Sequence, residues 1–357
     1  MRLFSSLPAA ALAAAALLLT AAAPTFTSVI PNTPIALPRD HGAHPNFRTE
    51  WWYVTGWLTT PEHQKLGFQI TFFRTRLATD PANPSKFAPK QILFAHAALS
   101  DPAAARLRHA QRIARQGFGL AEVSTADTKI TLDDWSLQRR ADGQFTAHVA
   151  GDGFALDLTL TPTQAAILQG DAGYSQKGPD PAEASHYFSL PHLKVGGSVT
   201  RAGKPAAITG TAWLDREWSS TLLNPRAVGW DWLGLNMDDG GALTLFRVRD
   251  AAGAPVWAGG SYRDKTGHQT KFAPTDVRFT AARRWKSPRT GALYPVAPTV
   301  TVRLNGIDRT IPVTPLFPDQ ELDSRRGGGP VYWEGAVTVP GGRGYLEMTG
   351  YAAPLKM

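Results

Sequence analysis

The chain has 357 residues, is 43 % hydrophobic, contains no cysteine and carries a formal net charge of +8. The lack of cysteine excludes disulfides, thiolate zinc sites and a thiol nucleophile, and the length suits two domains of moderate size. Because the basic residues are scattered, the charge does not indicate nucleic acid as a partner; it suits weak attraction to an anionic membrane surface, or solubility alone.

The first residues predict a secretory signal peptide over residues 1–23. Met1 and Arg2 precede an apolar run from Ala9 to Leu19, and small residues follow that run. This is the order of a basic, an apolar and a cleavage region. The run is too short for a typical membrane span, although an uncleaved anchor is the alternative. We therefore expect an exported protein, periplasmic in a Gram-negative source, with no cysteine to carry lipid.

Strand-like segments dominate the chain from Glu50 onward. The aromatic and β-branched run 50–58 and the run 67–74 flank a turn and predict a hairpin. Residues 103–116, rich in alanine and arginine, are the one clear helical candidate. The 33 glycines and 28 prolines punctuate short segments, as expected of β meanders.

Four blocks recur in the same order and indicate an internal duplication. The paired blocks are 50–58 with 229–235, 70–76 with 243–249, 158–162 with 311–315, and 186–188 with 331–333. We expect two domains, residues 24–222 and 223–357. Each suits an antiparallel up-and-down barrel with room for one ligand, and a β-sandwich is the structural alternative.

The segment around Asp215 carries the strongest signal for a functional site. Alternate residues of a strand share a face, so Trp213, Asp215 and Glu217 point one way. An aromatic ring and two carboxylates on one face suit a cavity that holds an apolar ligand beside an acid. The alternative is an ion-pair cluster with Arg216 or Arg247 as partner.

Other polar residues allow weaker interpretations. His186 shares a strand face with Phe188, and the ordinary alternative to a functional role there is a hydrogen-bonded structural histidine. Glu50 heads the aromatic strand and suits a buried partner for an arginine. Asp40 and His44 resemble a metal pair, but no third ligand has supporting spacing, so we expect no metal.

Several cofactor and catalytic motifs are absent from the sequence. It contains no Gly-x-Ser-x-Gly elbow, no P-loop, no strand-coupled Gly-x-Gly-x-x-Gly and no His-Glu-x-x-His. These absences argue against an α/β-hydrolase, a nucleotide-binding protein and a zinc protease of that type.

Several of these segments resemble the AttH-like family, which includes the carotenoid 1,2-hydratases. The resemblance covers roughly residues 38–352 and rests on five motifs, in residues 40–56, 213–219, 229–232, 332–335 and 344–347. It implies an all-β fold of two tandem lipocalin-like antiparallel β-barrels with little helix. For the hydratase branch it implies acid-catalysed addition of water to the terminal C=C bond of an acyclic carotenoid, without a cofactor.

The resemblance also implies catalytic roles. The His-x-Trp and Tyr-x-Asp pairs of the hydratase branch fall here on His186-x-Phe188 and Trp213-x-Asp215, so the ionisable members match and both aromatics differ. Asp215 is then the proton donor, kept protonated by burial in an apolar cavity, and His186 is the group that orients water and accepts its proton.

Aromatic faces would stabilise the resulting cation. Trp213, Phe188 and Trp230 are the candidates, with Glu217 as a further substrate-binding residue. Alignment of the two halves places the match to Asp215 near Thr349, so we expect a site in the first barrel or at the junction of the domains.

Three functions remain open from the sequence. The first is a carotenoid 1,2-hydratase-like enzyme that binds a hydrophobic isoprenoid or lipid. The second is a non-catalytic periplasmic carrier of a hydrophobic compound that serves an envelope transporter. The third is a structural role in the cell envelope.

Overall fold

A computed structural model describes residues 26–78, 83–85, 87–221 and 223–355. The predicted signal peptide, residues 1–23, lies outside the described residues. Within these ranges, no helix has the length and apolar character that a transmembrane helix requires.

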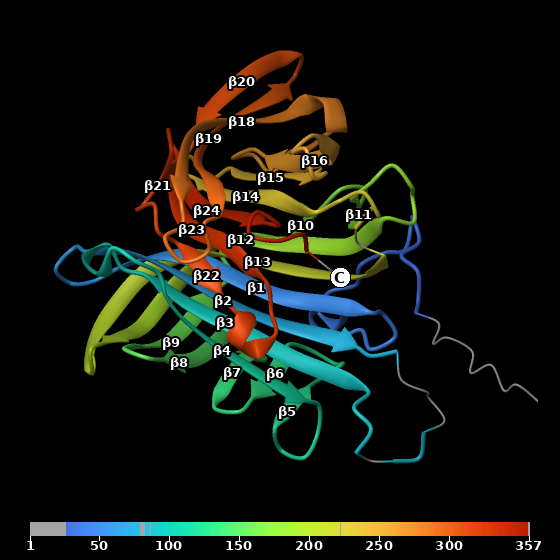
Figure 1. The fold of residues 1–357 in the computed structure, drawn as a ribbon, viewed down its shortest axis with the longest axis vertical. Coiled ribbons are helices and arrows are strands. Elements are labelled where there is room, and N and C mark those ends of the chain that lie inside the picture. The colour runs from blue at the N-terminus through green and yellow to red at the C-terminus, as the bar shows by residue number, and fades with distance from the viewer. Residues whose placement is uncertain (1–25, 79–82, 86, 222, 356–357) are drawn as a thin grey trace, which may run out of the picture.

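The first half of the described chain forms one antiparallel sheet that curves into a nearly closed barrel (Figure 1). Its strands are β1 Thr49–Thr59, β2 Lys65–Arg76, β3 Gln91–Ser100, β4 Arg108–Arg115, β5 Ala121–Val123, β6 Lys129–Leu132, β7 Trp135–Arg139, β8 Phe145–Gly151, β9 Phe154–Thr161, β10 Ile167–Leu168, β11 Tyr174–Gln176, β12 Ala184–Arg201 and β13 Lys204–Thr221. Their order is β4-β3-β2-β1-β13-β12-β9-β8-β7-β6-β5, and the short strands β10 and β11 pair with β12.

The second half forms an 8-stranded and a 3-stranded antiparallel sheet. The strands are β14 Gly229–Met237, β15 Ala242–Arg249, β16 Pro255–Arg263, β17 Gln269–Phe272, β18 Val277–Lys286, β19 Leu293–Leu304, β20 Ile307–Pro312, β21 Thr314–Pro315, β22 Glu321–Asp323, β23 Val331–Val339 and β24 Gly342–Thr349. The larger sheet has the order β17-β16-β15-β14-β24-β23-β21 with β22 beside β23, and the smaller is β18-β19-β20.

The described helices are single 3-10 turns, so the predicted all-β fold with little helix is confirmed. These turns are η1 Arg39–His41, η2 Pro102–Ala104, η3 Pro274–Asp276 and η4 Arg325–Gly327.

The helix predicted over residues 103–116 is wrong. The segment contains the end of η2 and the whole of β4, which pairs with β3 along its length. Alanine and arginine favour a helix in an isolated chain. Here β3 would otherwise present unpaired N–H and C=O groups, and pairing with that edge outweighs the local preference.

The two large sheets repeat one strand order. The series β3-β2-β1-β13-β12 corresponds to β16-β15-β14-β24-β23. In the first series Tyr53 on β1 pairs with Asp215, and in the second Trp232 on β14 pairs with Glu347. Glu347 is therefore the counterpart of Asp215.

The match to Asp215, expected near Thr349, falls at Glu347, two residues before it. Thr349 pairs with Tyr332 on β23, as Glu217 pairs with Tyr187 on β12. Thr349 is thus the counterpart of Glu217, because the ladder register, which the sequence alone does not give, fixes the correspondence.

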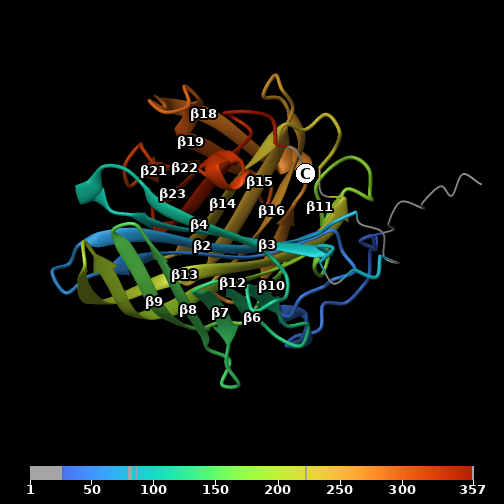
Figure 2. The ribbon, with the colours of Figure 1, turned by 60° about the horizontal axis from the view of Figure 1, so that its bottom comes forward.

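Two apolar cores lie on opposite faces of β1 and β13. The interior of the first barrel is filled by buried side chains, including Trp52, Phe72, Phe145, Phe188 and Leu214. The opposite face packs against the second sheet, which crosses over it (Figure 2). This second core includes Tyr53, Trp57, Trp213, Trp232 and Phe246. The alternation predicted for the strand around Asp215 therefore separates these two cores.

Candidate functional site

A cavity of about 860 Å³ lies between the outer face of the first barrel and the second sheet. Strands β1, β2, β3 and β13 form one wall, and β14, β15, β23 and β24 form the other. A volume of this size is within the range of small-molecule sites. The apolar part of the wall consists mainly of Trp51, Tyr53, Phe73, Phe94, Trp230, Trp232, Phe246 and Val248.

Asp215 faces this cavity and is only 3 % exposed. Its carboxylate accepts hydrogen bonds from the Tyr187 hydroxyl at 2.8 Å, and from the Ser189 hydroxyl and the Trp213 indole at 2.6 Å each. The Trp232 indole donates to the Tyr187 hydroxyl at 3.1 Å and orients it. Burial raises the pKa of Asp215 to about 7, although these three hydrogen bonds oppose the rise.

Glu217, the next residue on the same strand face, has a different environment. The Lys177 ammonium lies 3.1 Å from Glu217, and the Ser185 hydroxyl donates to the same carboxylate oxygen. The ammonium also lies over the rings of Tyr187 and Phe246, at 4.7 and 4.3 Å from their centroids. The first wall thus presents a carboxyl with neutral partners beside a carboxyl in an ion pair.

The opposite wall carries a second carboxyl pair. Glu334 on β23 and Glu347 on β24 are directly opposite each other in the ladder. Burial, and then the charge of Glu347, raises the pKa of Glu334, while the nearby Tyr53 hydroxyl, outside hydrogen-bonding geometry, opposes part of the rise. Burial raises the pKa of Glu347 to about 8, against the effect of the Trp230 indole and with a further contribution from Asp215.

The predicted site residues separate into two groups. Asp215, Glu217 and Trp230 line the cavity, and Trp213 lies directly behind Asp215 through its hydrogen bond. All four side chains therefore lie in the seam between the first barrel and the second sheet.

His186 and Phe188 lie on the other side of β12. They alternate with the seam-facing Tyr187 and point into the first barrel, where Phe188 is part of the core. The His186 ring packs against Trp218 at 5.4 Å and Phe47 at 5.8 Å, and burial lowers its pKa to about 4. The structure therefore does not bring His186 or Phe188 together with Asp215.

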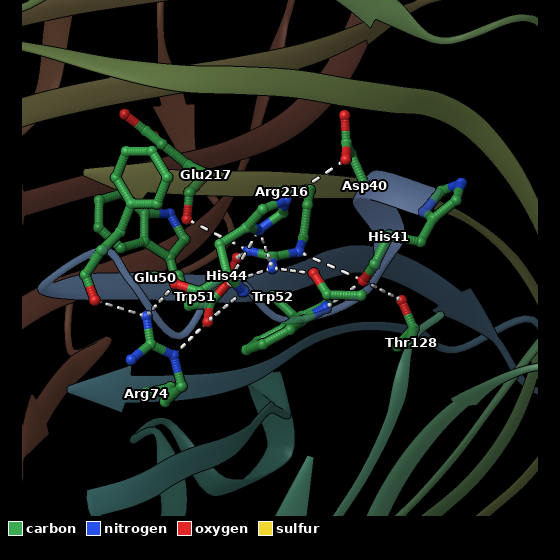
Figure 3. Close-up of polar contacts among 12 residues, drawn as sticks. Asp40, His41, His44, Glu50, Trp51, Trp52, Arg74, Thr128, Arg216 and Glu217 are labelled. Carbon is green, nitrogen blue, oxygen red and sulfur yellow. Dashed lines mark hydrogen bonds and ion pairs between the residues drawn. The ribbon is translucent and has the colours of Figure 1, made fainter. Parts of the chain in front are cut away.

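The predicted buried partner for Glu50 is a pair of arginines. Arg74 and Arg216 both form ion pairs with Glu50 in the barrel interior, and all three side chains are 0 % exposed (Figure 3). The Arg216 guanidinium stacks on Trp52, 3.7 Å from the ring centroid. The His44 backbone N–H also donates to Glu50, at 3.0 Å.

The ion-pair alternative holds for Glu217 alone, and with a cation other than the two predicted arginines. Arg216 belongs to Glu50, and Arg247 forms an ion pair with Asp231. The cation that reaches Glu217 is Lys177, which the sequence analysis did not single out.

The Asp40 and His44 pair contributes to the same cluster as Glu50. His44 Nε2 lies 3.5 Å from Asp40, and His44 Nδ1 lies 3.2 Å from Glu50. In the described part of the chain, no three His, Cys, Asp or Glu side chains are grouped so that they could hold a metal ion.

The site residues that sequence reasoning missed come from the second wall. Glu334 and Glu347 belong to motifs that carry the family resemblance, but neither received a role. Their common face could have been inferred from alternation within each strand. They share a cavity with Asp215 only because the two sheets pack face to face. No local sequence pattern predicts that packing.

Fold and site together define a class: a two-part, lipocalin-like β protein with an acid-lined cavity between its halves. Comparison with known proteins agrees, since the AttH-like family model matches residues 28–351. The chain belongs to the AttH-like family. An AttH protein from Nitrosomonas europaea is 49 % identical, with a TM-score of 0.85 over 91 % of this chain and 100 % of that one.

More distant solved structures share the fold. Kievitone hydratase from Nectria haematococca is 16 % identical, with a TM-score of 0.65 over 92 % of this chain and 96 % of that one. CghA is 10 % identical, with a TM-score of 0.51 over 94 % of this chain and 97 % of that one. No curated protein sequence matches the chain.

Proposed function

We propose that this protein is a hydratase-like enzyme that adds water to a C=C bond of an apolar, isoprenoid-like substrate held in the cavity. The observation that carries the proposal is Asp215, a buried carboxyl that faces apolar walls, has only neutral hydrogen-bond donors and has a pKa raised to about 7. Such a carboxyl can hold a proton near neutral pH and donate it to carbon. The fold shared with kievitone hydratase is consistent with this class of reaction.

The reaction would proceed through three proton transfers. Asp215 protonates one alkene carbon, and the other carbon becomes a cation that the faces of Trp230, Trp232 and Phe246 stabilise, at about 0.5–2 kcal/mol per ring contact. Water then attacks the cation and gives up its proton to Glu217, which takes the role that the resemblance assigned to His186. Return of that proton to Asp215 completes the cycle, so the net change is addition of one water.

Oxygen isotope incorporation tests this proposal. The purified protein is incubated with a lycopene-type acyclic polyene in ¹⁸O-labelled water, and the product is analysed by mass spectrometry. A labelled hydroxyl group that the parent protein introduces and the Asp215→Asn variant does not would support the proposal. A protein that binds the polyene tightly but never hydrates it would instead be a hydrophobic-ligand carrier, the second candidate.

The cavity opening continues into an exposed apolar patch on β4 and the neighbouring loops. Ile113 lines the cavity yet is 56 % exposed, and Phe87 and Phe118 stack on each other while 73 % and 59 % exposed. The Arg115 guanidinium lies over the Phe118 ring at 4.4 Å. We propose that this patch docks on an anionic membrane surface, where an apolar ligand could enter the cavity.

The combined change Phe87→Ser and Phe118→Ser is expected to lower partitioning onto phosphatidylglycerol vesicles at least about tenfold, because burying one phenyl ring contributes roughly 1.5–3 kcal/mol. Vesicle sedimentation measures the effect. Ile307→Ser is the control, since Ile307 on β20 is 55 % exposed and lies in another sheet. Equal partitioning of the double variant and the parent would rule out this docking surface.

We also propose that residues 1–23 direct export to the periplasm and are removed there. N-terminal sequencing of the protein purified from the periplasmic fraction of its host tests this, and a protein that retains Met1 and stays in the cytosol would contradict it. A transporter partner for the carrier alternative would be found by cross-linking in that fraction.

A further inference from the structure

We propose that Glu334, Glu347 and Tyr53 form a second subsite in the cavity, which binds the ammonium group of an organic cation with an apolar body. This inference concerns binding and does not depend on hydration at Asp215. It rests on three features of the second wall: the pairing of the carboxyls, their unpartnered atoms and the missing counter-charge.

The two carboxyls are held side by side by the backbone. Glu334 and Glu347 face each other across the β23–β24 ladder, so their side chains emerge on the same face of the sheet. Both line the cavity, and Glu334 is only 2 % exposed. Two charged carboxylates directly opposite each other in a ladder would repel, and burial adds to that cost, so without a neighbouring cation the pair retains a proton.

Two polar atoms of the subsite lie near each other but outside hydrogen-bonding geometry. Glu334 Oε1 and the Tyr53 hydroxyl are buried and make no hydrogen bond within the described residues, although both side chains line the cavity. A buried polar group without a hydrogen bond costs about 1–3 kcal/mol. A ligand that places a donor between them would satisfy the carboxylate oxygen directly.

The first wall shows how this cavity accommodates an ammonium group. Lys177 places its ammonium 3.1 Å from Glu217 and over the rings of Tyr187 and Phe246. Among the described residues, no lysine, arginine or histidine forms an ion pair with Glu334 or Glu347. The second wall therefore also presents two carboxyls, but without a cation beside them.

Aromatic faces complete the second subsite. Trp232 is the cross-strand neighbour of Glu347 on β14, and its ring meets the Tyr53 ring edge to face at 5.3 Å. An ammonium group at this point would contact carboxylates and ring faces together, as Lys177 does on the first wall. A hydroxyl group would satisfy the free oxygen but would bring no positive charge to replace the proton that the carboxyl pair holds.

The protonation of the carboxyl pair gives binding of a cation a signature that binding of a neutral ligand lacks. Burial raises the pKa of both carboxyls, so the empty pair holds at least one proton near pH 7. An ammonium group would displace that proton, and binding would release it to the buffer. The other titratable groups that line the cavity are Arg48, His96, Arg112, Lys177, Asp215, Glu217 and Tyr332. Asp231 lies close behind β14.

The test compares geranylamine with geraniol, two ligands that share an isoprenoid body and differ in the polar group. Isothermal titration at pH 7 is run in two buffers of different ionisation enthalpy. We expect geranylamine to bind at least about tenfold more tightly than geraniol and to release about one proton. Equal affinities, or amine binding without proton release, would overturn the proposal in favour of a neutral ligand or of no subsite.

Variants assign the effect to the pair. Glu334→Gln and Glu347→Gln are each expected to weaken amine binding at least about tenfold, to abolish proton release and to leave geraniol affinity within about twofold. Glu122→Gln, at an exposed position on β5, is the matched control and should bind as the parent does. Amine binding by both pair variants at parent affinity would sink the assignment.

Two further variants separate the cation subsite from the hydratase proposal. Tyr53→Phe removes the free hydroxyl without removing a charge, so it should weaken the amine by less than either glutamine variant and still fold. Asp215→Asn should lose any hydration activity and keep amine binding within about threefold. The failure of the cation subsite and the failure of the hydratase proposal are therefore separate results.

Discussion

Replacing Asp215 with asparagine is expected to lower kcat/KM for alkene hydration by about 10²–10⁴-fold, the usual contribution of a positioned general acid. Asparagine keeps the shape of the side chain and can accept the same hydrogen bonds from Ser189 and Trp213, but it has no proton to donate to carbon. Steady-state kinetics on the parent and the variant measure the loss. Hydration by Asp215→Asn at the parent rate would remove Asp215 from the mechanism.

The pH dependence provides a second check on the same residue. The acid form of Asp215 is the reactive one, and its pKa is raised to about 7, so the alkaline limb of the kcat/KM profile should fall about tenfold per pH unit above pH 7. Tyr187→Phe removes a hydrogen bond that favours the carboxylate, so it should move this limb to higher pH. A merely structural role for Tyr187 would lower the rate without moving the limb.

The free energy of unfolding of the Asp215→Asn variant shows whether a loss of activity reflects lost catalysis or a lost fold. The pKa of Asp215 in the folded protein is raised from 3.8 to about 7, so its contribution to the free energy of unfolding is most favourable below pH 3.8 and decreases as the pH rises to 7. Asparagine stays neutral throughout. At pH 8 the Asp215→Asn variant should therefore be at least as stable in urea as the parent.

Glu50→Gln is expected to lower the free energy of unfolding by about 3–5 kcal/mol, because removing the one carboxylate leaves Arg74 and Arg216 buried without a counter-charge. All three side chains are 0 % exposed, so water cannot replace the lost partner. Urea unfolding followed by tryptophan fluorescence measures the change. Glu122→Gln at the surface is the control, with an expected change within about 0.5 kcal/mol.

Acid titration tests the same cluster. Although burial opposes it, the Arg216 guanidinium holds the pKa of Glu50 well below its usual value of 4.5. A lowered pKa in the folded state contributes stability above pH 4.5, and this is lost as the pH falls toward the folded pKa. The parent should thus lose stability below pH 4.5 more steeply than Glu50→Gln. Parallel acid curves would show that the carboxylate is not the partner that the arginines need.

Much of the fold could be inferred from the sequence, because it depends on local regularities. The hairpin of β1 and β2 follows from two β-rich runs around a turn, and alternation correctly placed Asp215 and Glu217 opposite Arg216. The AttH-like motifs gave the family. The one helix prediction failed at Arg108–Arg115, because hydrogen bonding to the edge of β3 outweighed the local helix propensity of these residues.

The candidate site was only partly predictable. Alternation alone already separates His186 from Tyr187, yet the strand pairing that sets Tyr187, not His186, beside Asp215 is a long-range property. Lys177 follows the short strand β11 and reaches Glu217 across the sheet. Glu334 and Glu347 meet the other acids because one sheet lies over another, which no stretch of sequence encodes locally.

The filled interior of the first barrel limits where the sequence of such a protein can vary in evolution. Its packed side chains and the Glu50 cluster occupy the space in which a typical lipocalin holds its cargo, so alterations there endanger folding. The contact zone of the two halves already contains empty volume, and rings and acids there can be exchanged at a smaller thermodynamic penalty. Proteins that share this fold could therefore diverge in the small molecule they bind through changes in the cavity, while the packed first barrel keeps its structure.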